Sequence, residues 1–433
     1  MAISCGLFES NGYDLPSEKV YVALQSLDQV GIVDILTGDI EIVDIKYTTI
    51  SCNDYDSETV CNMASGCAWM DMESMSHCMA SEDDCIYLAE TQCNNTEGCE
   101  WAMNMCMEIG GMMDMGSHTP HFIVIDETNR YWFVTAITSG YVGRYNLDTN
   151  EFIDNILVND APALMVLNEQ NKKLYVSRMM PMEEMMMGAV SSKIQEIDYS
   201  NSEMLMMSDS FIVSSPVPHG LAINEDGSEI YVASNTADWL YKITPPSTNV
   251  IQGYVMDSTI GNSPDIVTQR LRPIQCLSIN NLLFVSCSGG IWYNSFTGEQ
   301  TNVPGQLQLW NSTTMTLIDA IQFGNESMPW HIINSASEER IFVVLSGDNL
   351  SPGSAGVICL NYTNNNMQIV WENYSEEFQK LHGIDISESG DIIYVSGRGD
   401  DNLHILRADN GNKIKSIPLG SNVMAAGIRA FHY

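Results

Sequence analysis

A hairpin-like unit recurs along the whole chain and limits it to few architectures. In Pro218–Ser234, PHGLAINEDGSEIYVAS, apolar side chains alternate with smaller or polar ones on both sides of an Asn-Glu-Asp-Gly segment. Alternation over short runs predicts β-strands, and a polar segment that ends in glycine predicts the turn between them. Each copy of the unit is therefore expected to form two antiparallel strands.

Six complete copies are present, and their first residues lie roughly 42 to 56 residues apart. The copies are Pro120–Ala136, Pro162–Arg178, Pro218–Ser234, Ile274–Ser288, Pro329–Ser346 and Leu381–Gly397. A seventh copy is divided between the chain ends. Val423–His432 has the first-strand pattern, and Ser17–Gln25 has the second-strand pattern.

A period of about 40 to 50 residues with several short strands in each repeat is typical of a β-propeller. Further strands follow each pair, as in Asn402–Pro418, so each repeat is expected to form a four-stranded blade. We predict an all-β fold: a seven-bladed β-propeller closed by N- and C-terminal strands in one blade, plus a small disulfide-rich insert. The predicted domains are blade 1 at 1–50, completed by 423–433, the insert at 51–119, and blades 2–7 with the closing strand at 120–433. The alternative is a pair of β-sandwiches.

The repeats resemble those of the YVTN-type seven-bladed propellers of bacterial and archaeal surface and periplasmic proteins. The resemblance is carried by PHGLAINEDGSEIYVAS, by LHGIDISESGDIIYVSG at Leu381–Gly397 and by VYVALQSLDQVGIVDI at Val20–Ile35. It covers the chain except for the insert. It implies a fold, whereas propellers host many different activities.

The composition is strongly acidic, with 18 basic residues, 55 acidic residues and a formal net charge of −37. Such a surface repels phosphate backbones, so we expect no nucleic-acid partner. No apolar run is long enough to span a bilayer, and the start of the chain lacks the apolar region of a signal peptide. Cys5 in Ala2-Ile3-Ser4-Cys5 is a candidate lipid anchor, and a chance cysteine is the alternative.

The segment from Ser51 to Thr119 has a different composition and contains eight of the twelve cysteines. They are Cys52, Cys61, Cys67, Cys78, Cys85, Cys93, Cys99 and Cys106. The spacing repeats as two four-cysteine units, each with a Cys-x5-Cys-x-Trp core that resembles the small plexin-type cysteine-rich repeat. An even count in a short unit with little apolar core indicates about two disulfides per unit, and hence an extracytoplasmic location: periplasm, cell surface or secreted. Structural zinc is disfavoured because no Cys-x2-Cys spacing is present.

Three further cysteines, Cys276, Cys287 and Cys359, lie on predicted blade strands. Cys276 and Cys287 fall on adjacent strands and are close enough in the pattern to pair. Buried free thiols are the default expectation for such positions.

The chain contains 27 methionines, and many lie among acidic, glycine and proline residues where no apolar periodicity requires them. Thioethers suit Cu(I) and remain available where thiols would be oxidised. The clusters resemble the methionine motifs of extracytoplasmic copper-handling proteins. The candidate ligands of the insert are Met112, Met113, Met115, His118, His121 and His77, and those of a third-blade insertion are Met179, Met180, Met182, Met185, Met186 and Met187. The alternative is a Met-rich packing or protein-contact surface.

Histidines also recur at the entrance of the first strand of the repeats. His121, His219 and His382 share one position, and His331 lies one residue later in its own copy. The other copies place Ala163, Gln275 and Met424 or Ala425 there. Since the first strand of a blade lines the channel, these histidines should converge near one mouth. They are candidate metal ligands. The alternative is that each histidine forms a hydrogen bond to the backbone of a neighbouring blade.

We find no nucleophile elbow, phosphate-binding loop, dinucleotide fingerprint or His-Glu-x-x-His pair. The sequence therefore favours a non-enzymatic, extracytoplasmic protein that binds a metal ion, with copper as the expected cofactor. One alternative is a metal-free cell-surface scaffold with a protein partner at the Met-rich face. The other is a copper-dependent oxidoreductase that uses the channel histidines.

Overall fold

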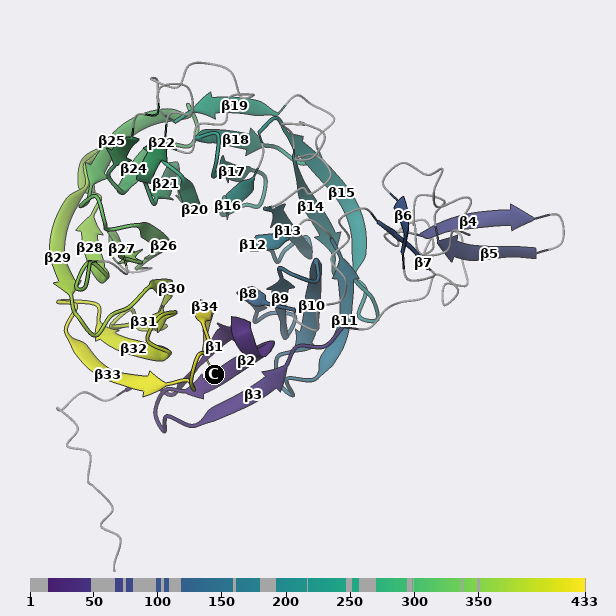
Figure 1. The fold of residues 1–433 in the computed structure, drawn as a ribbon, viewed down its shortest axis with the longest axis horizontal. Helices are drawn as coiled ribbons and strands as arrows, with labels where there is room; N and C mark the ends of the chain where they lie inside the picture. The colour runs from purple at the N-terminus through teal and green to yellow at the C-terminus, as the bar shows by residue number, and fades with distance from the viewer. Residues whose placement is uncertain are drawn as a thin grey trace, which may run out of the picture.

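The computed structural model describes residues 15–47, 67–72, 75–80, 99–102, 105–108, 118–158, 161–179, 192–215, 217–246, 251–256, 270–293, 298, 300–335, 338–348 and 351–432. These residues form seven four-stranded antiparallel sheets that surround a central channel (Figure 1). The predicted all-β, seven-bladed propeller is thereby confirmed.

The blades follow one another in chain order, and their strands have the following bounds. Blade 1 has β1 (Glu18–Leu24), β2 (Gln29–Asp34), β3 (Ile40–Asp44) and β34 (Ala425–His432), and blade 2 has β8 (Pro120–Asp126), β9 (Tyr131–Ala136), β10 (Tyr141–Asn146) and β11 (Phe152–Leu157). Blade 3 has β12 (Pro162–Asn168), β13 (Lys173–Arg178), β14 (Ser192–Asp198) and β15 (Met206–Val213), and blade 4 has β16 (Pro218–Ile223), β17 (Ile230–Ser234), β18 (Trp239–Ile243) and β19 (Gln252–Val255).

Blade 5 has β20 (Pro273–Ile279), β21 (Leu282–Cys287), β24 (Gln306–Asn311) and β25 (Thr316–Gln322), with an extra hairpin of β22 (Gly290–Tyr293) and β23 (Gln300–Val303). Blade 6 has β26 (Pro329–Asn334), β27 (Arg340–Leu345), β28 (Gly356–Asn361) and β29 (Gln368–Tyr374), and blade 7 has β30 (Leu381–Ile386), β31 (Ile392–Gly397), β32 (Asn402–Arg407) and β33 (Lys413–Pro418). The described residues contain only short 3-10 turns at Gln25–Leu27 and Thr363–Asn365 and no helix long and apolar enough to cross a membrane.

The two chain ends close the ring in blade 1. The C-terminal strand β34 pairs antiparallel with β1, with Val20 opposite Ala430 and Val22 opposite Ile428. β34 is thus the innermost strand of a blade whose other three strands come from the N-terminal end. Closure of this kind leaves no unpaired strand edge between the first and last blades.

The core is distributed over the interfaces between blades. Seven apolar clusters are present, and each is shared by two adjacent blades. The cluster between blades 7 and 1, for example, brings Tyr394 and Ile405 against Val22 and Ile428. This explains why β31 is buried along its whole length, whereas the outermost strand β29 is largely exposed.

A bulge at the start of the innermost strand shapes the channel. In blades 2 to 7 the pairing register shifts directly after the first residue of this strand, as between Pro218 and Gly220. The bulged residue has no partner in the hairpin, so its side chain is re-aimed. The glycine that follows two of the histidines is required by close approach: a Cβ on Gly383 would lie 2.6 Å from the carbonyl oxygen of Ala426 in the next blade.

Hydroxyl side chains connect the bulges of neighbouring blades. Ser177 Oγ on β13 accepts the Leu164 N–H of its own blade at 3.0 Å and donates to the His219 carbonyl of the next blade at 3.0 Å. Thr135, Ser286 and Ser396 make the same two bonds in blades 2, 5 and 7. These bonds satisfy backbone groups that the bulge removes from the ladder.

Aspartates in the turns between the second and third strands anchor the chain as it enters the next blade. Asp238 is fully buried, and its carboxylate accepts the backbone N–H groups of Arg270, Leu271 and Arg272 at 3.0 to 3.2 Å. In the same way, Asp28 accepts the backbone N–H groups of His118 and Thr119 before blade 2. Asp401 accepts those of Asn422 and Val423 before the closing strand of blade 1. All three aspartates have positive φ, a conformation that Asp tolerates better than most residues.

Asp238→Ala is expected to lower the free energy of unfolding by about 2 to 3 kcal/mol, because it leaves buried N–H groups without an acceptor. Asp238→Asn is the matched control, since it keeps one acceptor oxygen and a residue suited to positive φ. Urea unfolding of both variants measures the difference. An Ala variant as stable as wild type would show that the carboxylate bonds contribute nothing.

Between β3 and β8 the chain forms two separate hairpins, β4–β5 (Cys67–Met72 and Met75–Ala80) and β6–β7 (Cys99–Ala102 and Met105–Glu108). The two hairpins begin at equivalent cysteines, which agrees with the internal repeat in the sequence. The side chains of this segment lie outside the described residues, so its disulfides stay a prediction. On the blades, Cys276, Cys287 and Cys359 are free, and the first two are not bonded to each other.

Candidate functional site

Four histidines from four blades meet in the central channel. His121 lies on β8, His219 on β16, His331 on β26 and His382 on β30, and each is at most 5% exposed. The ring centre of His382 lies 4.8 Å from that of His331 and 5.2 Å from that of His121, which in turn lies 6.3 Å from that of His219. We call these four side chains the channel histidines.

The strand register corrects two of the equivalent positions that the sequence indicated. Ile274, not Gln275, occupies the bulge in blade 5, and Ala426, not Met424 or Ala425, occupies it in blade 1. The sequence alignment of the repeats was shifted by one residue in blade 5, because the innermost strand of that blade begins at Pro273. It was shifted by one or two residues in blade 1, because the sequence of that copy is divided between the chain ends. In blade 6 the bulge contains both Trp330 and His331. The side chain of His331 therefore lies in the channel although its position is one residue later than that of the other histidines.

Hydrogen bonds fix two of the four rings. His219 Nδ1 donates to the Ile274 carbonyl of the next blade at 2.6 Å. Blade 4 has Ala233 where other blades have the bridging hydroxyl, so this imidazole replaces a missing Ser or Thr. His121 Nδ1 lies 2.9 Å from Gln25 Nε2. A hydrogen bond to the backbone of a neighbouring blade is therefore present for one nitrogen of His219, whereas His121 bonds a side chain.

The remaining ring nitrogens are not all satisfied. Both nitrogens of His382, together with Nε2 of His121 and Nε2 of His331, are buried and have no hydrogen-bond partner among the described residues. Buried polar atoms without partners are uncommon in folded proteins and require an explanation. None of these three histidines forms an ion pair with a carboxylate within the described residues.

Burial keeps the channel histidines neutral. Desolvation is the first cause that lowers the pKa of His331 to about 3, and the neighbouring His219 lowers it further. The pKa values of His121 and His382 are lowered well below the usual range, again first by burial and then by the other channel histidines and by Arg398. The pKa of His219 is also lowered by burial, against the opposing effect of its bond to Ile274. Neutral imidazoles offer lone pairs, as metal ligation requires.

The rings are not already oriented around a common point. No three His, Cys, Asp or Glu side chains in the described ranges are arranged as a ready-made metal site. Beside the histidines, the inner strands line an open cavity of about 280 Å³, to which His331 contributes along with Phe122 and Cys276. The ring of Phe122 lies edge-on to His331, with centroids 5.6 Å apart.

Two polar neighbours of the channel histidines had no signal in the sequence. Trp330 occupies the bulge of blade 6, and its ring centre lies 5.4 Å from that of His382. Arg398 follows β31 directly, and its backbone N–H bonds the Lys380 carbonyl, two residues before His382. The Nε atom of Arg398 and the Nε1 atom of Trp330 are buried and have no described partner.

The other predicted ligands lie elsewhere or outside the described residues. His118 bonds Ser139 Oγ through Nδ1 at 3.2 Å and packs against Tyr141, and no contact joins it to His121. Met179 is half-buried at the end of β13. His77 lies on β5, but its side chain is not described. Met112, Met113, Met115, Met180, Met182, Met185, Met186 and Met187 lie outside the described residues.

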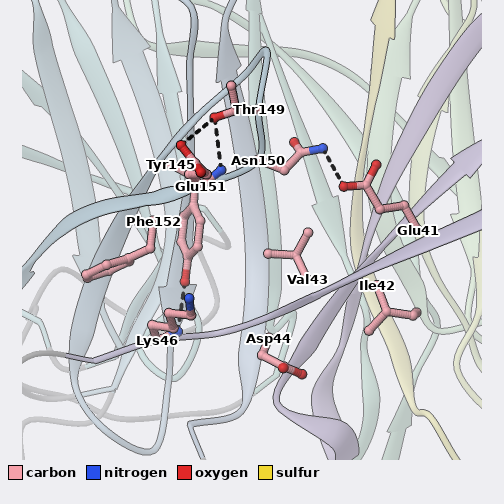
Figure 2. Close-up of a pocket in the computed structure, with 10 residues that line it drawn as sticks. All are labelled: Glu41, Ile42, Val43, Asp44, Lys46, Tyr145, Thr149, Asn150, Glu151 and Phe152. Atoms are coloured by element: carbon pink, nitrogen blue, oxygen red, sulfur yellow. Dashed lines mark hydrogen bonds between the residues drawn. The ribbon is translucent and has the colours of Figure 1, made fainter.

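A polar groove lies at the outer rim, between outer strands and away from the channel. It measures about 500 Å³ and lies between β3 and the β10–β11 hairpin. Figure 2 shows Asn150 pointing toward Glu41 across the groove, at 3.1 Å, and the Tyr145 hydroxyl accepting the Lys46 N–H at 2.9 Å. It contains none of the predicted site residues.

One histidine outside the channel is fully satisfied. His404 Nε2 lies 3.1 Å from Asp400 Oδ1, and its Nδ1 lies 2.9 Å from Ser416 Oγ. Phe378 packs edge-on against the ring, and His404 is 1% exposed. Asp400 is the last residue of an Arg-Gly-Asp tripeptide, and its buried carboxylate serves this turn.

The fold and the channel together define a seven-bladed β-propeller with four buried histidines in its central channel. No protein-family model and no curated protein matches the sequence. Among solved structures, a putative 6-phosphogluconolactonase from Bacteroides fragilis is 10% identical, covering 98% of this chain and 100% of its own, with a TM-score of 0.59. A protein from Lactobacillus plantarum is 9% identical over 96% and 99% of the two chains (TM-score 0.58), and Kuenenia stuttgartiensis hydrazine synthase is 13% identical over 70% and 80% (TM-score 0.53). At these identities the likeness shows the fold alone.

Proposed function

We propose that this protein is a non-enzymatic, extracytoplasmic metal-binding β-propeller, that its metal is copper, and that the channel histidines form the site. The observation that carries the proposal is the set of unpartnered nitrogens on His121, His331 and His382 inside one buried cluster. A metal ion would be a partner for all three rings at once. Histidine is the commonest protein ligand for such ions.

The ring separations suit a shared metal. A metal–nitrogen bond of about 2 Å places the centres of two imidazoles on one tetrahedral ion about 5 Å apart. His382 lies 4.8 Å from His331 and 5.2 Å from His121, close to this value. Metal binding would therefore require the rings to turn, with little change in the distances between them.

The groups around the cluster permit that turning. Neither nitrogen of His382 is bonded, so no hydrogen bond resists rotation of its ring. Gln25 Oε1 is also buried without a partner, so the amide can be turned over to accept the Nδ1–H of His121. His121 would then present its Nε2 lone pair to the metal. A polar partner on the distal nitrogen is the usual way in which a protein orients a ligating histidine.

Copper is favoured over other metals by ligand chemistry. Imidazoles bind both zinc and copper, and among divalent first-row metals copper binds most strongly to a given site. The methionine clusters of the insert and of the third blade would provide thioethers for Cu(I) before or after it reaches the channel. The extracytoplasmic location in this proposal is supported by the cysteine-rich segment, where the predicted disulfides would persist.

Copper analysis of His382→Gln tests the proposal. Wild-type protein freed of metal, incubated with Cu(I) under argon and desalted, is expected to retain one copper ion per chain by mass spectrometry. Loss of a ligand should weaken binding at least as much as loss of an outer-shell partner, which costs about 10- to 100-fold. A competition titration with a Cu(I) chelator measures this change, and a parallel zinc titration tests the choice of metal.

Two control variants separate the channel from the other candidates. His118→Gln removes an imidazole that does not contact the cluster and should leave channel binding unchanged. The triple Leu variant of Met112, Met113 and Met115 should still retain one copper ion per chain after desalting and should lose only weaker binding at excess Cu(I). If wild-type protein retains no copper, the proposal fails and the metal-free scaffold is favoured. If bound copper turns over electrons and His219→Ala abolishes this, the protein is an oxidoreductase.

A further inference from the structure

The side of the histidine cluster that faces Trp330 and Arg398 presents hydrogen-bond donors that lack acceptors. Tryptophan and arginine side chains can only donate, so neither can satisfy the other. Trp330 Nε1 and Arg398 Nε are both buried and unpartnered within the described residues. His382, whose ring centre lies 5.4 Å from that of Trp330 and whose pKa is lowered in part by the charge of Arg398, is 2% exposed and has two unpartnered nitrogens.

The arginine is also unusual for its lack of a counter-ion. The chain has 55 acidic residues against 18 basic ones, yet no described carboxylate forms an ion pair with Arg398. By contrast, Arg130, Arg144 and Arg407 each pair with a nearby aspartate. A partly buried guanidinium without an anion is unfavourable, since a buried charge needs a compensating partner. The missing partner must be an acceptor, and a negative charge suits it best.

We propose that the channel binds a small carboxylate, held by Arg398 Nε–H, Trp330 Nε1–H and the ring of His382. A carboxylate is planar, has acceptor positions on both oxygens and pairs well with the flat edge of a guanidinium. A phosphate dianion would be opposed more strongly by the net charge of −37 and by the shortage of further cations nearby. The ligand must be small, because the donors lie within a buried cluster.

The backbone holds this site in place. The Arg398 N–H bonds the Lys380 carbonyl at 3.1 Å, which connects the end of β31 to the start of β30. The Trp330 carbonyl accepts from Ser286 Oγ of the preceding blade at 2.5 Å. Burial lowers the pKa of the Arg398 guanidinium, which agrees with a cation that lacks a counter-ion. Trp330, His382 and Arg398 thus come from two adjacent blades that pack as one unit.

The inference shares His382 with the proposed metal site but does not require the metal. One nitrogen of a neutral imidazole donates and the other accepts. His382 can therefore donate to a carboxylate in metal-free protein. When a metal occupies the other nitrogen, a carboxylate oxygen is also a suitable additional ligand for it.

Formate is the simplest probe. Metal-free full-length protein, treated with chelator, is titrated with sodium formate at constant ionic strength, and binding is followed by thermal unfolding and by calorimetry. We expect a saturable rise in Tm. Arg398→Gln should weaken formate binding at least tenfold, equivalent to about 1.4 kcal/mol. Trp330→Phe keeps the ring beside His382 but removes the donor, and it should weaken binding by about fivefold, since one hydrogen bond is lost.

Arg407→Gln is the matched control, because Arg407 is a half-buried arginine at the end of β32 that is paired with Asp409. It should bind formate as wild type does. An absent or non-saturable effect of formate on wild type would overturn the inference, as would equal binding by Arg398→Gln and wild type. Phosphate or chloride binding more tightly than formate would overturn the carboxylate assignment. If Arg398→Gln does not fold, Trp330→Phe decides. The formate titration uses metal-free protein, so its outcome does not depend on whether the protein retains copper. The two proposals can therefore fail separately.

Discussion

Acid is expected to destabilise the protein by about 3 kcal/mol between pH 7 and pH 4 through His331 alone. Its pKa is lowered to about 3 in the folded channel, mainly by burial, whereas an unfolded histidine titrates near 6.5. Between these two values the unfolded chain binds a proton that the folded chain does not. The free energy of unfolding is therefore unaffected by His331 above about pH 6.5. Below that pH it falls by about 1.4 kcal/mol per pH unit until pH approaches 3.

His331→Leu separates this contribution from the titration of the many carboxylates. Urea unfolding of both proteins is measured across the pH range. From pH 7 to pH 4 the free energy of unfolding of wild type should fall by about 3 kcal/mol more than that of the variant. Phe122→Leu is the matched control, because it alters the ring that packs on His331 without removing a titratable group. That variant should lose a constant amount of stability at every pH. Parallel pH profiles for wild type and His331→Leu would contradict the prediction.

The architecture was predictable because a propeller repeats its local pattern in every blade. The alternation in Pro218–Ser234 and its copies reflects strands covered on both faces by neighbouring blades, so the same pattern appears wherever a blade forms. The divided copy at Ser17–Gln25 and Val423–His432 identified the closing strands, and β1 and β34 do pair. The sequence also placed histidines at equivalent entrances, and the structure brings those rings together.

The surroundings of the channel histidines could not be predicted in the same way. The bulge and the residue after the second strand recur from blade to blade, but only blade 6 has a tryptophan in the bulge and only blade 7 has an arginine after the second strand. Gln25 meets His121 across 96 residues of sequence. His118 and His121 were grouped because they are close in the sequence. His118 lies in the loop before β8 and His121 lies on β8. An extended chain advances about 3.3 Å per residue, so three residues are enough to separate the two side chains. Contacts of this kind depend on the path of the backbone and not on the repeat.

The bridging hydroxyls show how a structural role can be filled by a residue with functional potential. Blades 2, 3, 5 and 7 use Thr135, Ser177, Ser286 and Ser396 to bond the bulge carbonyl of the next blade. Blade 4 has Ala233 instead, and His219 bonds the Ile274 carbonyl through Nδ1. Since that bond fixes the tautomer, the lone pair of His219 is on Nε2. A histidine with a structural bond on one nitrogen can therefore still act as a ligand through the other.

A second large effect is expected at the buried ion pair of blade 2 that also bonds the chain of blade 3. Arg144 on β10 is 0% exposed and makes two bonds to Asp154 on β11, at 2.8 and 3.0 Å. Arg144 also donates to the carbonyls of Asn201 and Ser202, and Asp154 accepts the Leu205 N–H at 2.6 Å. Arg144→Met leaves the carboxylate buried without its counter-ion and is expected to cost about 3 to 5 kcal/mol of unfolding free energy.

The double variant Arg144→Met/Asp154→Leu determines whether the cost arises from the unpaired charge. Replacing both partners with apolar residues removes the buried charge, so the double variant should recover much of the stability that Arg144→Met loses. Arg130→Met, at the exposed pair with Asp148, is the surface control and should cost less than about 1 kcal/mol. Urea unfolding of the four proteins completes the comparison. If the double variant is no more stable than Arg144→Met, the cost arises from the lost bonds of Arg144 to Asn201 and Ser202 and not from an unpaired buried charge.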